Sequence, residues 1–420
     1  MSSQTVEFSP TAVLTGSFFD RLARQTLERI IGKLDCDRIT LRDETGERTF
    51  GTRSAEGLHA IVDVRRPSFY RRILTGGSLG AAEAFLDGDW TTDDLTVLIR
   101  ILIRNMHVAN GMDRGLSRVT RLLARGLHWW RRNTRAGSRR NIEAHYDLGN
   151  DFFRLFLDET MMYSSGIFER PDSTLHEASV AKIDRICREL DLRPTDHLLE
   201  IGTGWGGFAL HAARHYGCRV TTTTISREQF DLARQRIDDA GLNERVHVLL
   251  KDYRDLTGQY DKLVSIEMIE AVGHQFLDMY FRKCGELLKP AGLMLLQGIV
   301  MNEQRYAEYL RSADFIQRYV FPGGCLPSVL AIGQAVAKTT DMRVLHVADF
   351  ASHYVRTLSA WHTRFHSALD RVRELGYSER FIRLWEYYLC YCEAAFTERY
   401  VGVVQMLLAK PGNFRMISTG

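Results

Sequence analysis

The spacing of apolar and polar positions divides the chain into two regions of different character. Residues 17–31 carry apolar side chains at helical intervals, and residues 38–51 and 59–64 contain short strand-like runs with a glycine-containing turn. From about residue 141, strand-like runs alternate with helix-like ones, as in a parallel sheet covered by helices. We therefore predict a small α+β domain over residues 1–112 and a larger α/β domain over residues 141–420.

The larger domain has the element order of a Rossmann-like fold. Strands are predicted at residues 197–201, 219–224, 246–250, 262–266 and 293–299, and helices at residues 177–190, 208–216 and 227–240. A turn at Lys289–Gly292 should lead into the fifth of these strands. Residues 300–420 are rich in aromatic side chains and are predicted to be mostly helical.

Composition adds little about partners but narrows the setting. The chain has 420 residues, 45% hydrophobic and 25% charged, with a net charge of only +3, so we expect no nucleic-acid partner. Seven scattered cysteines without a C-x-x-C pair disfavour disulfides and a metal site, and predict a reducing cytoplasm. The most apolar run, residues 95–106, is too short and too charged to span a bilayer.

The segment between the two domains, residues 113–140, is strongly basic. Nine arginines lie between Arg114 and Arg140 without any acidic residue, and Trp129 and Trp130 lie among them. One interpretation is a solvated linker helix. The interpretation we favour is a helix on an anionic membrane surface, because arginines pair with phosphates and tryptophans settle at the interface. The protein would then be cytoplasmic and peripherally membrane-associated.

A glycine-rich turn follows the first strand of the larger domain. Gly202, Gly204 and Gly206 stand between that strand and the next helix, so backbone N–H groups are free to bind a ligand. Glu200 before the turn could balance a cationic methionine group, whereas the next strand lacks the acid that grips the ribose of NAD. Asp252 and Tyr253 after the third strand could hold adenine. The turn predicts an S-adenosylmethionine site, with NAD or no ligand as alternatives.

Several longer motifs together resemble the cyclopropane-fatty-acyl-phospholipid synthase family, which includes the mycolic acid cyclopropane synthases. The matching stretches are Ala144–Phe153, Met162–Ser165, Leu199–Gly207, Ile225–Gln229, Lys251–Asp255 and Phe321–Ser328, with Leu79–Trp90 in the accessory domain. The resemblance implies a class I S-adenosylmethionine-dependent methyltransferase domain with a lipid-binding accessory domain. It also implies cofactor contacts at Tyr163, Ser164, Gly202, Gly204, Thr224, Gln229 and Tyr253.

The resemblance further implies methyl transfer to a cis double bond in a phospholipid acyl chain. Loss of a proton from the new methyl closes a cyclopropane, and loss from a neighbouring carbon leaves a methylene or methyl-branched chain. There are two rival hypotheses. One is a methyltransferase that acts on a soluble small molecule, and the other is a lipid-binding protein with a decayed site. Whether the chain forms a homodimer stays open.

The chain departs from the family pattern at the residues that hold the base, the group that removes the proton. Family members hold a bicarbonate with a Cys, a Glu, a His and a Tyr, and the matching positions here are Ser165, Glu270, Gln297 and Tyr354. Two further acids are near in sequence, Glu143 and Glu267, and a helical segment would put Glu267 on one face with Glu270. One hypothesis is that Glu143 or Glu267 replaces bicarbonate as the base; the other is that bicarbonate still binds.

Overall fold

The computed structural model describes residues 17–52, 57–112, 148–312 and 314–415. The chain forms two compact units, Met1–Thr120 and Arg121–Gly420, and each is considered by itself. The basic segment 113–140, Glu143 and the start of the Ala144–Phe153 motif lie outside the described residues, so their predicted roles stay predictions. The same holds for the proposed three-part division of the chain.

The first unit is a four-stranded sheet packed with helices. Its elements are α1 (Phe18–Ile31), β1 (Arg38–Asp43), β2 (Gly46–Gly51), β3 (His59–Val64), α2 (Ser68–Leu86), β4 (Trp90–Thr92), α3 (Leu95–Arg104) and α4 (Met106–Met112). The strand order is β2-β1-β3-β4, with β1 antiparallel to β2 and parallel to β3. Ser17 begins α1 through a capping box and Asp94 caps α3.

Helix α2 is formed by two helical segments that meet at Gly77, whose φ is 60°. Glycine adopts this conformation without strain, so Gly77 allows the change of direction inside the helix. The α+β character of the unit is confirmed.

The second unit contains a seven-stranded sheet in the order β10-β11-β9-β8-β5-β6-β7. Its strands are β5 (His197–Ile201), β6 (Arg219–Thr224), β7 (Val246–Leu250), β8 (Tyr260–Ile266), β9 (Leu288–Met301), β10 (Arg343–Asp349) and β11 (Val401–Ala409). The first five are parallel and were predicted, although Lys289–Gly292 lies within β9 instead of preceding it as a turn. Antiparallel β10 and β11 fall in the region predicted as mostly helical.

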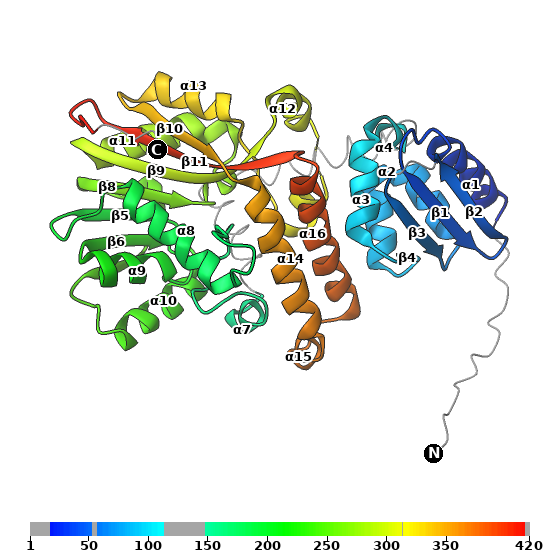
Figure 1. Ribbon diagram of the computed structural model, residues 1–420, viewed down its shortest axis with the longest axis horizontal. Coiled ribbons are helices and arrows are strands. Elements are labelled where there is room, and N and C mark those ends of the chain that lie inside the picture. Colours follow the sequence, from blue (N-terminus) through cyan, green and yellow to red (C-terminus); the bar gives the residue numbers. More distant parts are fainter. Residues whose placement is uncertain (1–16, 53–56, 113–147, 313, 416–420) are drawn as a thin grey trace, which may run out of the picture. The chain divides into compact units, whose positions relative to one another are not determined.

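Helices cover both faces of this sheet (Figure 1). The helices of this unit are α7 (Asn150–Arg154), α8 (Leu175–Glu189), α9 (Gly207–Tyr216), α10 (Arg227–Asp239), α11 (Leu277–Leu287), α12 (Glu303–Tyr309), α13 (Val329–Thr339), α14 (Ala351–Ser367), α15 (Leu369–Glu374) and α16 (Glu379–Thr397). Short 3-10 turns lie at Tyr253–Asp255, Ile269–Ala271 and His274–Phe276, and a π-helical turn at Ile316–Val320.

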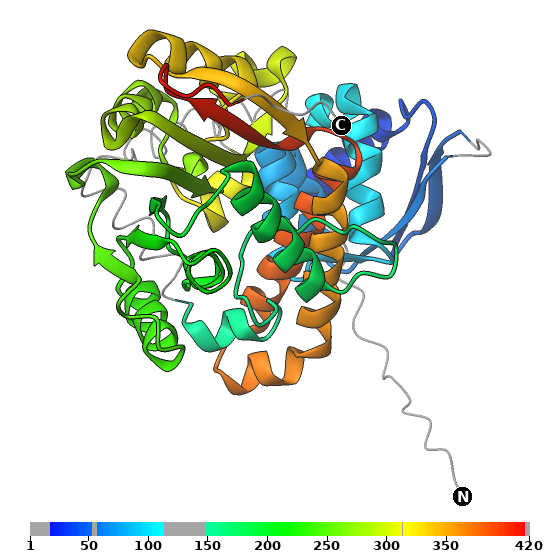
Figure 2. The same cartoon turned by 60° about the vertical axis from the view of Figure 1, so that its left-hand side comes forward.

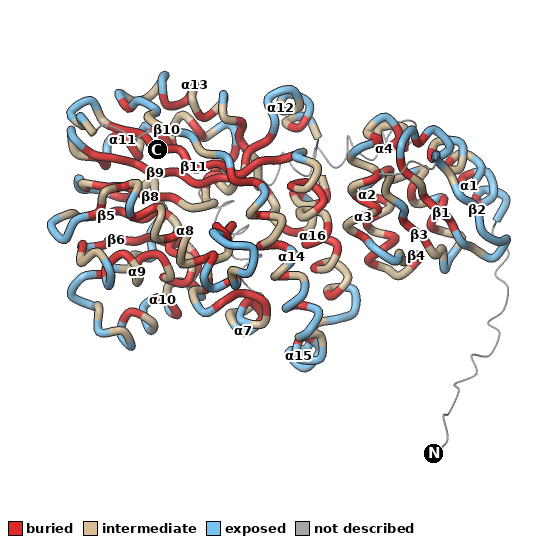
Figure 3. Tube along the Cα trace, in the orientation of Figure 1, coloured by how far each residue is buried: buried red, intermediate tan, exposed pale blue. Residues whose placement is uncertain are grey.

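Successive strand residues enter two separate cores. Leu198 packs in the core with α8, α9 and α10, and its neighbour Leu199 packs in the core with α11 and α13. Leu407 and Leu408 of β11 divide in the same way. Figure 3 shows the buried positions following the strands. Because both faces are buried, β11 reads as a continuous apolar run, which periodicity cannot assign to a strand.

Two antiparallel helices complete the second unit. In Figures 1 and 2, α14 and α16 lie side by side and are joined through α15. Tyr354 of α14 and Tyr388 of α16 both line the cavity described below, so this helical hairpin supplies one of its walls. Among the described residues, no helix is long and apolar enough to cross a membrane.

Candidate active site

A cavity of about 310 Å³ lies at the carboxyl ends of the parallel strands, where ligands bind in open α/β sheets. Twelve predicted site residues line it: Tyr163, Ser164, Glu200, Gly202, Gly204, Thr224, Gln229, Asp252, Tyr253, Glu267, Glu270 and Tyr354. Ser165 and Gln297 are buried behind the cavity wall, and Gly206 is not among the lining residues. The sequence motifs therefore converge on one cavity.

The glycine-rich turn forms one end of this cavity. Gly202 and Gly204 have φ values of 103° and 52°, a conformation that glycine adopts freely. Gly202 N–H and Thr203 N–H both donate to Thr223 O at 3.0 Å, which ties the turn to β6. The predicted cofactor contact at Gly206 stays a prediction, because Gly206 is not among the lining residues. It precedes α9 with φ 85°, and a Cβ there would lie 3.3 Å from the Ala233 side chain, so its conformation serves helix packing.

Buried charges lie beside the turn. The Glu200 carboxylate accepts a 2.6 Å hydrogen bond from the Thr222 hydroxyl, and burial raises its pKa to about 8. Lys182 of α8 is fully buried and donates to Ser164 Oγ at 2.8 Å, and burial lowers its pKa to about 8. A bound cation would favour ionised Glu200, so this end of the cavity suits a ligand with a positively charged group.

Polar side chains at the carboxyl ends of β6 and β7 form hydrogen bonds with neighbouring side chains. Thr224 donates to Gln229 Oε1 at 2.8 Å, which links the end of β6 to the first turn of α10. Asp252 accepts two hydrogen bonds from the Arg254 guanidinium, at 2.8 and 2.5 Å. Tyr253 lines the cavity beside them. Asp252 and Tyr253, predicted to hold adenine, therefore both line the cavity, and the Asp252 carboxylate is already paired with an arginine.

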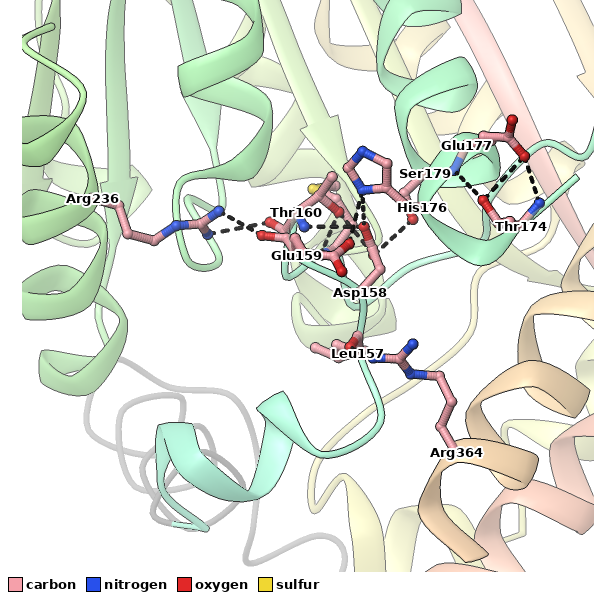
Figure 4. A network of polar contacts seen from close by, with 11 residues as sticks. Leu157, Asp158, Glu159, Thr160, Thr174, His176, Glu177, Ser179, Arg236 and Arg364 are labelled. Atoms are coloured by element: carbon pink, nitrogen blue, oxygen red, sulfur yellow. Dashed lines mark hydrogen bonds and ion pairs between the residues drawn. The ribbon is translucent and has the colours of Figure 1, made fainter. Parts of the chain in front are cut away.

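The segment that carries Tyr163 and Ser164 is anchored just before the cavity (Figure 4). Asp158 accepts hydrogen bonds from the Thr160 backbone at 3.0 Å and from Ser179 at 2.9 Å. Arg236 donates to the carbonyl oxygens of Glu159 and Thr160 at 2.9 and 3.2 Å. These bonds fix the backbone that leads into the cavity.

A second polar cluster lies at the other end of the cavity, centred on Glu267. One oxygen of its carboxylate accepts hydrogen bonds from Ser165 N–H at 2.9 Å and from Gln297 Nε2 at 2.8 Å. The other accepts one from the Tyr354 hydroxyl at 2.7 Å. The Ser165 hydroxyl itself donates to the Gly166 carbonyl, so its backbone and not its side chain contacts the carboxylate. Three of the four positions that resemble bicarbonate ligands thus surround a protein carboxylate.

Glu270 is the fourth of those positions. One carboxylate oxygen accepts from Ile299 N–H at 2.5 Å, and the other is buried without a hydrogen-bond partner among the described residues. Burial and the charge of Glu267 raise the pKa of Glu270 to about 8, and burial also raises the pKa of Glu267. The expected helix is absent: Glu267 has φ 48° and precedes a 3-10 turn. A non-glycine residue in this region is strained, which is frequent at functional sites.

Two members of the site were missed from the sequence. Lys182 lies within the apolar stripe formed with Ala178, Ile183 and Ile186, and a lysine on the buried face of a helix could have been noticed. Gln405 of β11 donates to Gln297 Oε1 at 3.0 Å. No local pattern marks Gln405, because it lies in a strand that was not predicted and contacts a residue 108 positions away.

Residues 133–406 match the family model described as mycolic acid cyclopropane synthetase. The chain belongs to this family. It is 36% identical to the tuberculostearic acid methyltransferase UfaA1 of Mycobacterium tuberculosis, over 96% of this chain and 93% of that protein. It is 37% identical to the cyclopropane-fatty-acyl-phospholipid synthase of Escherichia coli K12, over 84% of this chain and 88% of that protein.

A solved structure of the mycolic acid cyclopropane synthase CmaA1, in complex with SAH and CTAB, has the same fold. It superposes with a TM-score of 0.61 at 33% identity, covering 65% of this chain and 98% of that one. As a member of the cyclopropane synthase family, the chain is an S-adenosylmethionine-dependent methyltransferase that modifies fatty acyl chains. This confirms the predicted methyl-donor site over the NAD alternative.

Proposed function

We propose that the enzyme transfers a methyl group from S-adenosylmethionine to the cis double bond of an unsaturated acyl chain in membrane phospholipid. The observation that carries the proposal is the single cavity that joins a glycine-rich cofactor end to a buried carboxylate cluster. Its remaining wall is rich in apolar and aromatic side chains, among them Phe321, Tyr388 and Phe396. Such a wall suits an acyl chain and excludes water from the reacting atoms.

The residues at the cofactor end fit the methyl donor. Glu200 would face its cationic methionine group, Gly202 and Gly204 allow the backbone to approach it closely, and Tyr253 would contact the adenine. The bound donor supplies an electrophilic methyl on a sulfonium. The protein must then align the alkene with that methyl, because an alkene is a weak nucleophile. Aromatic faces of Tyr163 and Phe321 would stabilise the positive charge that develops on carbon.

The base we propose is Glu267. Its carboxylate accepts the hydrogen bonds that the family resemblance assigns to bicarbonate, from Ser165 N–H, Gln297 and Tyr354. A carboxylate whose pKa is raised by burial accepts a proton more readily than an exposed one. In this role Glu267 takes the proton lost by the alkylated chain, and no bicarbonate is needed. Glu143 stays an alternative base.

The first candidate product is a cyclopropane acyl chain, because a base with the same hydrogen-bond donors would reach the proton of the new methyl. The second candidate is a methylene chain, formed when a hydride shifts to the cationic carbon before the new methyl loses its proton, or an unsaturated methyl-branched chain, formed when a neighbouring chain carbon loses the proton. It is favoured by a tethered base in place of a free anion, and by the similarity to a tuberculostearic acid methyltransferase over almost the whole chain.

One experiment tests the reaction and separates the products. The enzyme is incubated with methyl-labelled S-adenosylmethionine and vesicles of unsaturated phospholipid, and the extracted lipid is counted and examined by proton NMR. Label in the lipid with upfield cyclopropyl signals supports the first candidate, and label with vinylidene or methyl-branch signals supports the second. Label confined to water-soluble products would contradict the lipid substrate.

The base is tested by Glu267→Gly. Glycine suits the backbone at φ 48° and leaves a space lined by Ser165 N–H, Gln297 and Tyr354. We expect activity to fall at least 100-fold and to be partly restored by added bicarbonate or formate. A wild-type rate without added anion would overturn the assignment. Glu143→Gln is the matched control and should keep its rate.

We also propose that the basic segment 113–140 binds an anionic membrane surface, which would bring the cavity to its lipid. The support is its sequence, nine arginines between Arg114 and Arg140 without an acid among them. Replacing Arg131, Arg132, Arg135, Arg139 and Arg140 with glutamine should lower binding to anionic vesicles and leave binding to neutral ones unchanged. Equal binding of both proteins to anionic vesicles would refute this role.

A further inference from the structure

The helical hairpin carries a group of metal-binding side chains that the methyl transfer does not use. His362 and His366 are one turn apart on α14, and Glu386 lies opposite them on α16. One donor atom from each of the three lies within 4.8 Å of the other two. Two imidazoles and a carboxylate from two packed helices are a common way to bind a transition metal.

The geometry is close to that of a bound zinc ion. Zinc–nitrogen and zinc–oxygen bonds of about 2.0–2.1 Å put tetrahedral ligand atoms roughly 3.3–3.4 Å apart. The His366 Nε2 and Glu386 Oε1 atoms are 3.8 Å apart, and the two imidazole ring centres are 4.4 Å apart. Since no two of the three donor atoms are more than 4.8 Å apart, each needs to move by at most about 0.7 Å, within the reach of a side-chain rotation.

The surroundings favour a borderline metal over magnesium or calcium. Imidazole ligands suit zinc and its neighbours, whereas magnesium and calcium prefer oxygen atoms alone. The thiol of Cys390, one turn after Glu386, lies 3.7 Å from His362 Nε2 but is not one of the three donors that lie together. The His366 side chain is 41% exposed, so an ion can enter from solvent.

We propose that His362, His366 and Glu386 form a zinc site that fastens α14 to α16. The same two helices carry Tyr354 and Tyr388 to the cavity, so a metal at this place would stabilise the wall that holds the proposed base. The sequence predicted no metal site here, because Glu386, the third ligand, lies 20 residues after His366 and belongs to no short motif with the two histidines. The proposal does not depend on which lipid is the substrate.

A second group with metal-binding residue types provides the matched control. Asp158, Glu159 and His176 also have donor atoms within 4.8 Å of one another. The Asp158 carboxylate, however, already accepts hydrogen bonds from Thr160 and Ser179, which position the backbone leading to the cavity (Figure 4). With one imidazole and an engaged carboxylate, this group should bind zinc much more weakly.

The experiment measures zinc binding by the full chain. The protein is stripped with a chelator, and zinc is titrated in competition with a chromophoric chelator. We expect about one tight site per chain in the wild type. Both His366→Gln and Glu386→Gln should weaken it at least tenfold, and His176→Ala should leave it unchanged. Zinc should raise the Tm of the wild type by about 5 °C and that of His366→Gln by much less.

His366→Gln is informative because the His366 side chain is partly exposed and lies outside the buried core, so its loss opens no core cavity. Far-UV circular dichroism checks that each variant is folded. The proposal is overturned if the wild type and His366→Gln bind zinc equally, or if His176→Ala removes the tight site. Neither result would bear on methyl transfer, which is measured separately with labelled donor.

Discussion

The two ends of the cavity are built in different ways. The cofactor end consists of consecutive strand ends and turns, where Thr224 is the last residue of its strand and Gly202 and Tyr253 lie just after theirs. The base end, by which we mean the part of the cavity around the proposed base Glu267, consists of side chains from distant segments. Ser165, Gln297 and Tyr354 meet at Glu267 across separations of 102, 30 and 87 residues.

The difference indicates where such an enzyme can change. A site made by backbone geometry depends on a few glycines and on the strand order, and it suits every member that uses the same donor. A site made by side chains can exchange its base one residue at a time while the donor site is untouched. Here Ser165 and Gln297 replace two family residues, and Glu267 occupies the centre of their hydrogen bonds.

The largest effect is expected at the base end. Glu267→Gln keeps the size of the side chain but cannot accept the proton, so kcat should fall about 10²- to 10⁴-fold. The dissociation constant for S-adenosylmethionine should stay within about twofold, because Glu267 belongs to the other end of the cavity. Rapid-mix kinetics and calorimetric titration measure the two quantities. A large loss of donor affinity would show that the two ends are not separable.

The opposite pattern is expected at the cofactor end. Glu200→Gln keeps the hydrogen bond from Thr222 but removes the charge that would face the cationic donor. Loss of one charge-assisted contact of about 1.5–3 kcal/mol should weaken donor binding roughly 10- to 100-fold. The rate at saturating donor should change little. The same titration measures it, and a fall in kcat with unchanged affinity would contradict the division between the two ends.

The buried ammonium group of Lys182 influences the pKa of two carboxylates, those of Glu200 and Glu267. Its ammonium charge lowers the pKa of both Glu200 and Glu267 against the effect of burial. Since Glu267 must be ionised to accept a proton, kcat should rise as pH passes its raised pKa. Lys182→Met removes the opposing charge, so the acid limb of the kcat–pH profile should move to higher pH by about one unit.

The control for this change is Lys262→Met. Lys262 is also buried, but its ammonium donates to the Leu190 carbonyl, and it does not line the cavity. Its loss should lower stability without moving the pH profile. An identical shift in both variants would mean that Lys182 acts through stability alone and does not tune the base.

Sequence patterns predicted the cofactor end well for a physical reason. The strand, the glycine turn and the next helix are contiguous, so their spacing alone identifies Gly202 and Gly204. The base end required contacts between distant segments. The family resemblance predicted Ser165, Glu270, Gln297 and Tyr354. Glu267 was proposed on the assumption that its segment is helical, which is wrong, and Gln405 was missed.

The errors in the fold have the same origin. Strand β11 is buried on both faces, so it lacks the alternation that identifies a strand. The π-helical and 3-10 turns around the cavity have no strong local signal. Long-range packing decides these elements, and a single sequence does not display it.

The smallest effect is expected when two glycines of the same turn are each replaced by alanine and their affinities for the donor are compared. Gly204 and Gly206 have φ values of 52° and 85°, so alanine at either position should cost about 1 kcal/mol of unfolding free energy. Only Gly204 lines the cavity, and a Cβ there would meet open space within 4 Å, the space the donor is expected to fill. Gly204→Ala should therefore weaken donor binding about tenfold and Gly206→Ala less than twofold, although Gly206→Ala should lower the Tm more because its Cβ would lie 3.3 Å from the Ala233 side chain. Equal effects on donor affinity would mean that the turn acts only through its backbone conformation and that its individual positions carry no separate contact.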